Sequence, residues 1–208
     1  MTEASHSPDP AAAAPSGERP APAPIPSEVL EGVTRGDSEA LGTLFEACFD
    51  DLYGLAFRML GNHAAAEDAL QDVFLKLHRA AGNLDPQRDP RPWLRTITAN
   101  HCRDHYRSFG ARVTRQSTPV DESEDGMQLT DRGPAPDSGT LADEKAVLVQ
   151  QALDRLPAQD REVVVLRDYE GLDHGTIAEM LGASSAAVRK RYSRALSRLG
   201  ELLQDVWP

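Results

Sequence analysis

The sequence lacks the features that define several large classes of protein. It has only two cysteines in 208 residues, too few for a disulfide framework, which favours a reduced compartment. No apolar run approaches the roughly 18 residues needed to cross a bilayer. The N-terminus also lacks the charged-then-apolar order of a signal peptide. We therefore expect a soluble, cytoplasmic protein with no membrane partner.

Signatures of enzymes and metal sites are missing as well. The chain contains no G-x-S-x-G motif, no P-loop and no facing set of His and carboxylate side chains. His101 and His105 share a helix face, but Cys102 points elsewhere and no carboxylate completes a ligand set. We expect no enzymatic activity, no metal, no cofactor and no small-molecule substrate.

Charge is distributed unevenly along the chain. The formal net charge of −11 argues against a protein that coats DNA without specificity, because phosphate binding needs cations. Acidic residues dominate positions 27–86, whereas positions 88–115 are rich in arginine. This asymmetry indicates nucleic acid as a partner of the basic segment and a basic protein surface as a partner of the acidic one.

The pattern of apolar residues predicts an all-α fold of two small helical domains joined by a flexible linker. Residues 1–26 are mostly Ala, Pro and Ser and predict a disordered tail. Residues 27–108 predict four helices around one core, with Ser38 as the N-cap of the second and Gly61-Asn62 ending it. Residues 109–140 lose periodicity and predict an acidic linker. Helical spacing resumes over 141–206, with segments at 141–156, 163–169, 177–181 and 188–203.

The C-terminal segment GLDHGTIAEMLGASSAAVRKRYSRALSRL reads as a helix-turn-helix. Gly182 stands at the turn, and Ser184 can cap the second helix. Val188, Tyr192, Ala195 and Leu199 define an inward face, which leaves most of the Arg and Lys side chains outside. Small residues followed by a basic face suit the major groove of DNA. A merely solvated basic face is the alternative interpretation.

The central segment WLRTITANHCRDHYR combines a large aromatic, an amide and several arginines on one helix. Trp93 alone would more often be a core residue. Asn100, however, offers both a donor and an acceptor to the edge of an extruded base. An aromatic ring can stack on an unpaired base. The segment therefore indicates contact with melted DNA.

These two segments and the acidic helices before them resemble an extracytoplasmic-function (ECF) sigma factor of the sigma-70 superfamily, group 4. The resemblance covers about residues 27–110 and 141–204, and it departs from the family pattern at Ala186-Ala187, where Gly-Thr is usual. It implies a transcription initiation factor that recognises the −35 promoter element and melts the −10 element. Its implied partners are bacterial core RNA polymerase, promoter DNA and a cognate anti-sigma factor.

The resemblance also implies roles for individual residues. The residues that would contact the −10 element lie on one predicted helix; they are Trp93, Arg95, Asn100, Arg103 and Arg107. The −35 element would be contacted through Ser184, Arg189, Lys190, Ser193 and Arg194. Core polymerase would be bound through Asp68, Gln71, Asp72, Phe74 and Lys76. A one-component helix-turn-helix regulator is the alternative; it would bind an operator without polymerase and would not need Trp93.

Overall fold

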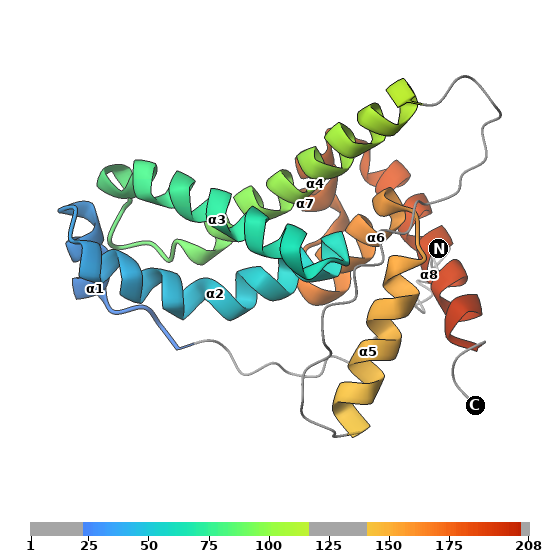
Figure 1. Ribbon diagram of the computed structural model, residues 1–208, viewed down its shortest axis with the longest axis horizontal. Coiled ribbons are helices and arrows are strands. Elements are labelled where there is room, and N and C mark those ends of the chain that lie inside the picture. Colours follow the sequence, from blue (N-terminus) through green and yellow to red (C-terminus); the bar gives the residue numbers. More distant parts are fainter. Residues whose placement is uncertain (1–22, 117–140, 205–208) are drawn as a thin grey trace, which may run out of the picture.

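The computed structural model describes residues 23–116 and 141–204, and every regular element among them is a helix (Figure 1). The predicted all-α fold with two helical domains is confirmed. In chain order the elements are α1 (Ser27–Thr34), α2 (Ser38–Leu60), α3 (His63–Ala80), η1 (Ala81–Asn83), α4 (Arg91–Gln116), α5 (Leu141–Asp154), α6 (Ala158–Val164), η2 (Val165–Tyr169), α7 (His174–Leu181) and α8 (Ser185–Gln204).

The N-terminal domain is built from α1 to α4 around the long helix α2. Apolar side chains at spacings of three and four along α2 and α3 are buried, as the periodicity predicts. The largest fully buried side chains of this domain are Val33, Leu44, Leu55, Met59, Leu70, Val73, Leu77 and Leu94. The exposed sides of α2 and α3 carry the acidic residues that give this domain its charge.

The ends of α2 are set by local hydrogen bonds. Asp37, not Ser38, is the N-cap: its carboxylate accepts from the backbone N–H groups of Glu39 at 2.9 Å and Ala40 at 3.3 Å. The prediction is one residue late because Ser and Asp are both good caps. At the other end, Gly61 adopts the left-handed conformation with φ 68° and terminates α2, as predicted.

Helix α4 is longer than the sequence analysis predicted. It runs to Gln116, so the predicted domain boundary at 108 and the first residues of the predicted linker fall inside a helix. Apolar periodicity in the sequence predicts a buried face rather than helical backbone, so it does not locate the end of a helix. Residues 1–22 and 117–140, which hold most of the predicted tail and linker, lie outside the described residues.

The C-terminal domain contains α5, α6, η2, α7 and α8. The helix predicted at 163–169 begins earlier, at Ala158, directly after Pro157. It continues as a π-helical turn, η2, over Val165–Tyr169. Such wide turns are rare and occur mostly as single turns within α-helices. Helices α7 and α8 form the predicted helix-turn-helix.

The two domains pack against each other in the described structure. One continuous cluster of buried residues includes Leu55 and Met59 of the N-terminal domain together with Val163, Leu166 and Ile177 of the C-terminal domain. Figure 1 shows α6 beside the C-terminal end of α2 and α7 beside the middle of α4, where Arg103 donates to the backbone carbonyl of Met180. The domains are therefore in contact here, and not held apart as two independent bodies.

Candidate nucleic-acid and protein interfaces

The helix-turn-helix is formed by local caps at both of its helices. The Asp173 carboxylate accepts from the N–H groups of Gly175 at 2.7 Å and Thr176 at 3.1 Å, which starts α7. Gly182 ends α7 with φ 62°, a left-handed conformation that favours glycine. The Ser184 hydroxyl then accepts from the N–H of Ala187 at 3.2 Å. The predicted turn and the predicted Ser184 cap are both present.

Tyr192 fixes the inner face of α8 against its neighbours. The Tyr192 hydroxyl donates to the Asp168 carboxylate at 2.7 Å, and the His174 ring packs edge-on against Tyr192 at 5.4 Å between centroids. Burial, reinforced by the neighbouring Asp168 carboxylate, raises the pKa of Tyr192 to about 12. Tyr192 therefore remains a neutral donor that links α8 to both η2 and α7.

The outward residues of α8 divide into two groups. Arg189, Lys190 and Ser193 are exposed, as a surface that meets DNA requires. Arg194 instead donates to the carboxylate of Asp160 at 2.7 Å, and Asp160 is only 1% exposed. The sequence analysis placed Arg194 on the DNA side and did not identify this pairing, because nothing in the local sequence marks Asp160 as a buried acid.

The central helix α4 presents its predicted base-contacting residues near the surface. Trp93 lies close to the start of α4 and is 37% exposed, so it is not the core residue that an aromatic at helical spacing would usually be. The Asn100 side-chain oxygen accepts from the Arg103 guanidinium at 3.1 Å. Arg107 is exposed on the same helix.

The other two predicted arginines of α4 are held by carboxylates. Arg95 forms an ion pair with Asp51 of α2 and lies 3.3 Å from the Glu170 carboxylate in the C-terminal domain. Arg103 donates to Glu162 at 2.7 Å. Burial raises the pKa of Glu162, while the hydrogen bond and charge of Arg103 act in the opposite direction. Two guanidinium groups that are suited to bind phosphate are thus already paired with carboxylates in this structure.

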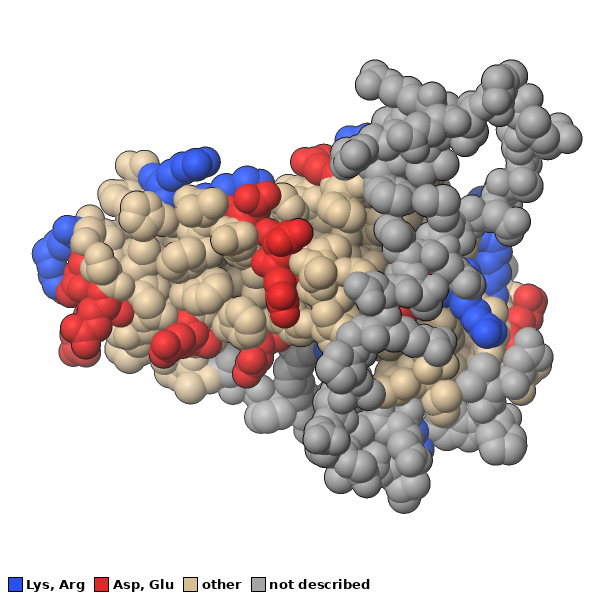
Figure 2. Space-filling view, viewed as in Figure 1, with Lys and Arg blue, Asp and Glu red and all other residues tan. Residues whose placement is uncertain are grey.

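Four of the five residues predicted to bind polymerase lie on the exposed face of α3. They are Asp68, Gln71, Asp72 and Lys76, and Figure 2 shows acidic side chains gathered over this part of the molecule. The fifth, Phe74, is half-buried and its ring packs 4.5 Å from that of Phe45 on α2. The four polar side chains therefore share the exposed face of α3, whereas Phe74 packs toward α2.

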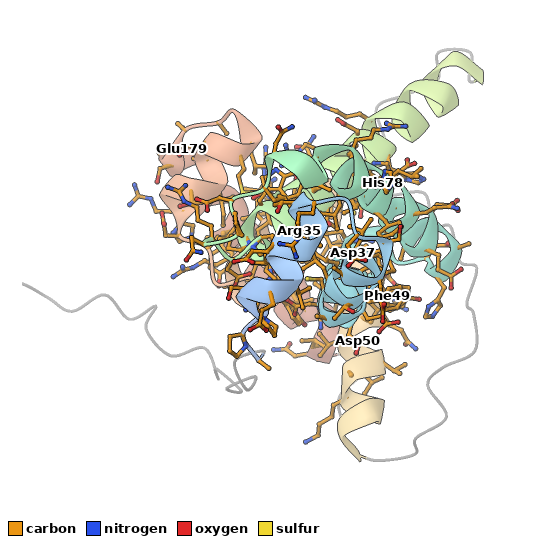
Figure 3. The ribbon with its side chains drawn as sticks, turned by 90° about the vertical axis from the view of Figure 1, so that its left-hand side faces the viewer. Arg35, Asp37, Phe49, Asp50, His78 and Glu179 are labelled. Atoms are coloured by element: carbon orange, nitrogen blue, oxygen red, sulfur yellow. The ribbon has the colours of Figure 1, made fainter. Side chains whose placement is uncertain are left out.

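Aromatic side chains continue along α2 beside this face. Phe45, Phe49, Tyr53 and Phe57 follow one another at helical spacing, with successive ring centroids 5.5, 5.7 and 6.3 Å apart. Phe49 is exposed and, with Asp50, is labelled on α2 in Figure 3. This aromatic row was not predicted from the sequence.

The described residues contain neither a cluster of metal ligands nor a membrane-spanning helix. Across residues 23–116 and 141–204, no group of three or more His, Cys, Asp or Glu side chains is arranged to hold a metal ion. Over the same ranges no helix is both long and apolar enough to cross a bilayer.

An acidic helical domain with an exposed tryptophan on its arginine-rich helix, followed by a capped helix-turn-helix, defines a two-domain DNA-binding protein. Comparison with protein-family models gives two matches in the same order. Residues 44–112 match sigma-70 region 2, and residues 146–199 match sigma-70, region 4. The matched segments correspond to the two domains described above.

Curated relatives agree over most of the chain. The ECF RNA polymerase sigma factor SigM of Mycobacterium tuberculosis is 35% identical over 177 residues, which cover 85% of this chain and 84% of the relative. RNA polymerase sigma factor CarQ of Myxococcus xanthus is 33% identical, covering 85% and 97%. The chain belongs to the ECF family of RNA polymerase sigma factors.

Two solved structures of similar fold are complexes with a second protein. The sigma factor RpoE of Bartonella quintana, in complex with the anti-sigma factor NepR, has a TM-score of 0.56 and 25% identity, covering 77% of this chain and 94% of that one. CnrH, in complex with the cytosolic domain of CnrY, has a TM-score of 0.54 and 26% identity, covering 86% and 97%.

Proposed function

We propose that this protein is a promoter-specificity subunit that brings core RNA polymerase to a defined set of promoters and starts transcription there. The observation that carries the proposal is the presence, in one chain of this family, of two helices suited to different forms of DNA. Helix α8 exposes a basic face suited to duplex, and α4 exposes Trp93 beside Asn100. The polymerase supplies the chemistry, so the subunit itself is not an enzyme, and it acts in the cytoplasm.

Recruitment to polymerase is assigned to the exposed face of α3. Asp68, Gln71, Asp72 and Lys76 present a mainly acidic polar surface, which complements a basic helix on a partner. Phe74 and Phe45 lie next to this face and supply apolar area at its edge. Charged rims of this kind mainly steer association, while the apolar part holds the complex together.

Duplex recognition is assigned to α8. Its N-terminal end is capped by Ser184, which leaves the hydroxyl and nearby N–H groups close to where a phosphate would lie. Arg189 can form a bidentate contact with guanine, and Lys190 and Ser193 can contact phosphate. Arg194 stays partly available at 52% side-chain exposure, but its main partner in the structure is Asp160.

Capture of a melted base is assigned to α4. Stacking on an aromatic ring is worth about 1–3 kcal/mol per base, comparable to the few kcal/mol needed to extrude one base from a duplex. Trp93 would supply the stacking surface and Asn100 would supply hydrogen bonds to the base edge. Arg95, Arg103 and Arg107 would bind the phosphates around that base.

The family relatives also suggest an inhibitory partner. RpoE is solved with a protein named as an anti-sigma factor, and CnrH is solved with the cytosolic domain of CnrY. We therefore extend the proposal to a cognate anti-sigma factor that binds this chain.

Reconstitution tests the main proposal directly. Bacterial core polymerase with the purified full chain should give discrete run-off transcripts from promoters selected out of genomic DNA, and core polymerase alone should not. A one-component regulator would instead bind its DNA tightly without polymerase and would leave start-site selection unchanged. That second pattern would overturn the proposal.

A further inference from the structure

One ion pair joins the proposed polymerase-docking face of α3 to the helix that carries the base-capturing residues. Nε2 of His101 on α4 lies 3.5 Å from Oδ2 of Asp72 on α3. Asp72 is assigned to polymerase docking and its side chain is 58% exposed, whereas that of His101 is 21% exposed. His101 directly follows Asn100, which is assigned to the edge of the melted base. The pair therefore lies between two proposed binding surfaces of the same domain.

Helix packing explains why His101 contacts α3. His101 lies on the same side of α4 as Leu94 and Thr98, because residues three, four and seven apart share a helix face. Leu94 and Thr98 are buried, and α4 packs against α3. Asn100 is turned about 100° from His101 around the helix axis. His101 therefore acts on the Asp72 side chain, while its neighbour Asn100 is left for DNA.

Charged and titratable groups of both helices face the His101 ring. Asp72 and Lys76 come from α3, and Asp104 and His105 come from α4. Burial lowers the pKa of His101 below its usual 6.5, and Lys76 and His105 act in the same direction, whereas the two carboxylates raise it. The imidazole is therefore mostly neutral near neutral pH and gains its second proton in mildly acidic conditions.

The protonation state of His101 decides how strongly it holds Asp72. Their separation of 3.5 Å is longer than the roughly 2.7–3.2 Å of an ordinary hydrogen bond, so the attraction arises mainly from charge. A neutral imidazole carries no charge and leaves the carboxylate with its full negative charge toward solvent. An imidazolium attracts the carboxylate, as ion pairs at partly exposed sites do. Protonation thus gives Asp72 a partner within the chain.

A polymerase that docks on Asp72 competes with this internal partner. The proposed docking places a basic surface of polymerase against the acidic face of α3. When His101 is charged, that surface meets a carboxylate that is already paired, so docking is weaker. The effect is reciprocal, because binding free energies are linked. Docking therefore makes His101 harder to protonate, and complex formation in mildly acidic solution releases a proton.

Resting on the proposed function, we propose that His101 is a positioning residue for polymerase docking: in its neutral form it leaves the Asp72 carboxylate available to polymerase, and in its protonated form it holds that carboxylate against α4. The helix that captures the melted base thus carries the group that adjusts recruitment. Docking on core polymerase is then weaker in mildly acidic conditions, and this dependence requires a titratable side chain at position 101.

The affinity for core polymerase at two pH values tests this inference. The full chain, labelled with a fluorophore, is titrated with bacterial core polymerase near pH 7.5 and near pH 5.5 at constant ionic strength, and fluorescence anisotropy gives the Kd. His101→Gln keeps a polar side chain without a titratable group. On acidification the wild-type Kd should increase about two- to fivefold more than the Kd of His101→Gln. The pH dependence of polymerase itself is common to both chains and cancels in this comparison.

His78→Gln is the matched control, because it makes the same substitution at an exposed residue near the C-terminal end of α3 (Figure 3). Its Kd should follow that of the wild type in both buffers, and circular dichroism in each buffer verifies that every variant is folded. If the wild type and His101→Gln show the same pH dependence, the inference is wrong. If the wild-type chain does not bind core polymerase in either buffer, the proposed function fails instead.

A fixed charge separates the role of charge from that of shape. His101→Lys carries a cation at both pH values, so near pH 7.5 its Kd should be about two- to fivefold higher than that of His101→Gln. Adding Asp72→Asn to both variants should reduce this difference, because the cation then has no carboxylate to hold. A difference that Asp72→Asn leaves undiminished would overturn the inference. A purely structural role for His101 would weaken both variants alike at every pH.

A measurement on the free chain tests the pair without polymerase. The Cε1–H signal of the His101 ring, followed by NMR through a pH titration, reports the pKa of His101 directly. Asp72→Asn removes a carboxylate that raises this pKa, so the midpoint should fall by about 0.2 to 0.7. Asp68→Asn, one turn earlier on α3, should leave the midpoint unchanged. Equal midpoints for the wild type and Asp72→Asn would refute the pairing even where recruitment of polymerase is demonstrated.

Discussion

Arg194, on the surface of α8, forms an ion pair with the buried Asp160 of α6 and so joins the two helices. The Arg194 guanidinium donates to the Asp160 carboxylate at 2.7 Å, and Arg198 donates to the other oxygen at 2.9 Å. A carboxylate that is 1% exposed needs such partners, because burying an unpaired charge is very unfavourable. Two arginines on the recognition helix are thus committed to orienting it.

We predict that Arg194→Ala lowers the free energy of unfolding, because it removes one of the two arginine partners of a buried acid. The expected loss is about 1–2 kcal/mol, measured by urea denaturation of the full chain. Arg189→Ala is the matched control, since Arg189 is exposed on the same helix. It should change stability by less than about 0.5 kcal/mol while weakening promoter binding. Equal losses of stability would contradict this division of roles.

A second prediction concerns Trp93. Trp93→Ala should impair promoter opening by polymerase by about 5- to 100-fold, the equivalent of about 1–3 kcal/mol of lost stacking. Permanganate reactivity of unpaired thymines in the −10 element measures this opening. Because Trp93 is 37% exposed, most of its side chain is buried and Trp93→Ala should also lower stability, so opening is measured at a temperature at which the variants are folded. Trp93→Tyr keeps an aromatic surface and should retain much of the activity; an equal defect in both variants would argue against stacking.

A third prediction addresses docking on polymerase. Asp68→Lys reverses a charge on the proposed α3 surface, so it should slow association with core polymerase, most strongly at low salt. Glu179→Lys, the same change on α7, should leave the association rate unchanged. Surface plasmon resonance at two salt concentrations distinguishes the variants. A similar rate for both would place the docking surface elsewhere.

Two glycines provide a fourth prediction, because both end a helix in the left-handed conformation. Gly182→Ala should cost about 1 kcal/mol of stability from backbone strain alone, since nothing lies within 4 Å of an added Cβ. Gly61→Ala carries the same strain and also collides with Asp154, so it should cost more and should widen the free chain in solution scattering. If both variants scatter alike, the close approach at Gly61 does not hold the domains together.

The pH dependence of stability is the fifth prediction. Burial raises the pKa of Glu162 above its usual 4.5, opposed by Arg103, Arg191 and Arg107. A carboxyl whose pKa is higher in the folded chain than in the unfolded chain binds protons more readily when folded, so its contribution to stability is complete below pH 4.5 and declines as pH rises through the raised value. The free energy of unfolding, measured by urea denaturation, should therefore contain a part that decreases with pH in this window. Glu162→Gln should remove that part of the dependence; an unchanged pH profile would contradict it.

Sequence reasoning predicted the helices well where each has its own local signal. The spacing of Leu44, Leu55 and Met59 along α2, the turn at Gly182 and the Ser184 cap were all found in the structure. Periodicity and capping are properties of neighbouring residues, so a single sequence contains them. The end of α4 was missed because helical backbone without an apolar face leaves no such signal.

The contacts between domains could not be predicted in the same way. Arg103 and Glu162, and Arg161 and Met59, are far apart in sequence and come together only when both domains are folded and docked. In the sequence Arg103 reads simply as a phosphate-binding side chain, and Glu162 as one acid among many. The sequence pattern predicts residues that would bind DNA, but it carries no information on which protein groups these side chains contact in the folded chain.

The π-helical turn at Val165–Tyr169 makes the domain contact depend on a single inserted residue. A π turn contains one residue more than the α turn it replaces, and each residue of an α-helix rotates the following side chains by about 100°. A chain shorter by one residue within this turn would keep the helix but swing Tyr169 and Glu170 away from Arg58 and Arg95, which they face across the domains. Insertions and deletions here would therefore alter the contact between the domains, and they would also shift Asp168, which holds Tyr192 of α8.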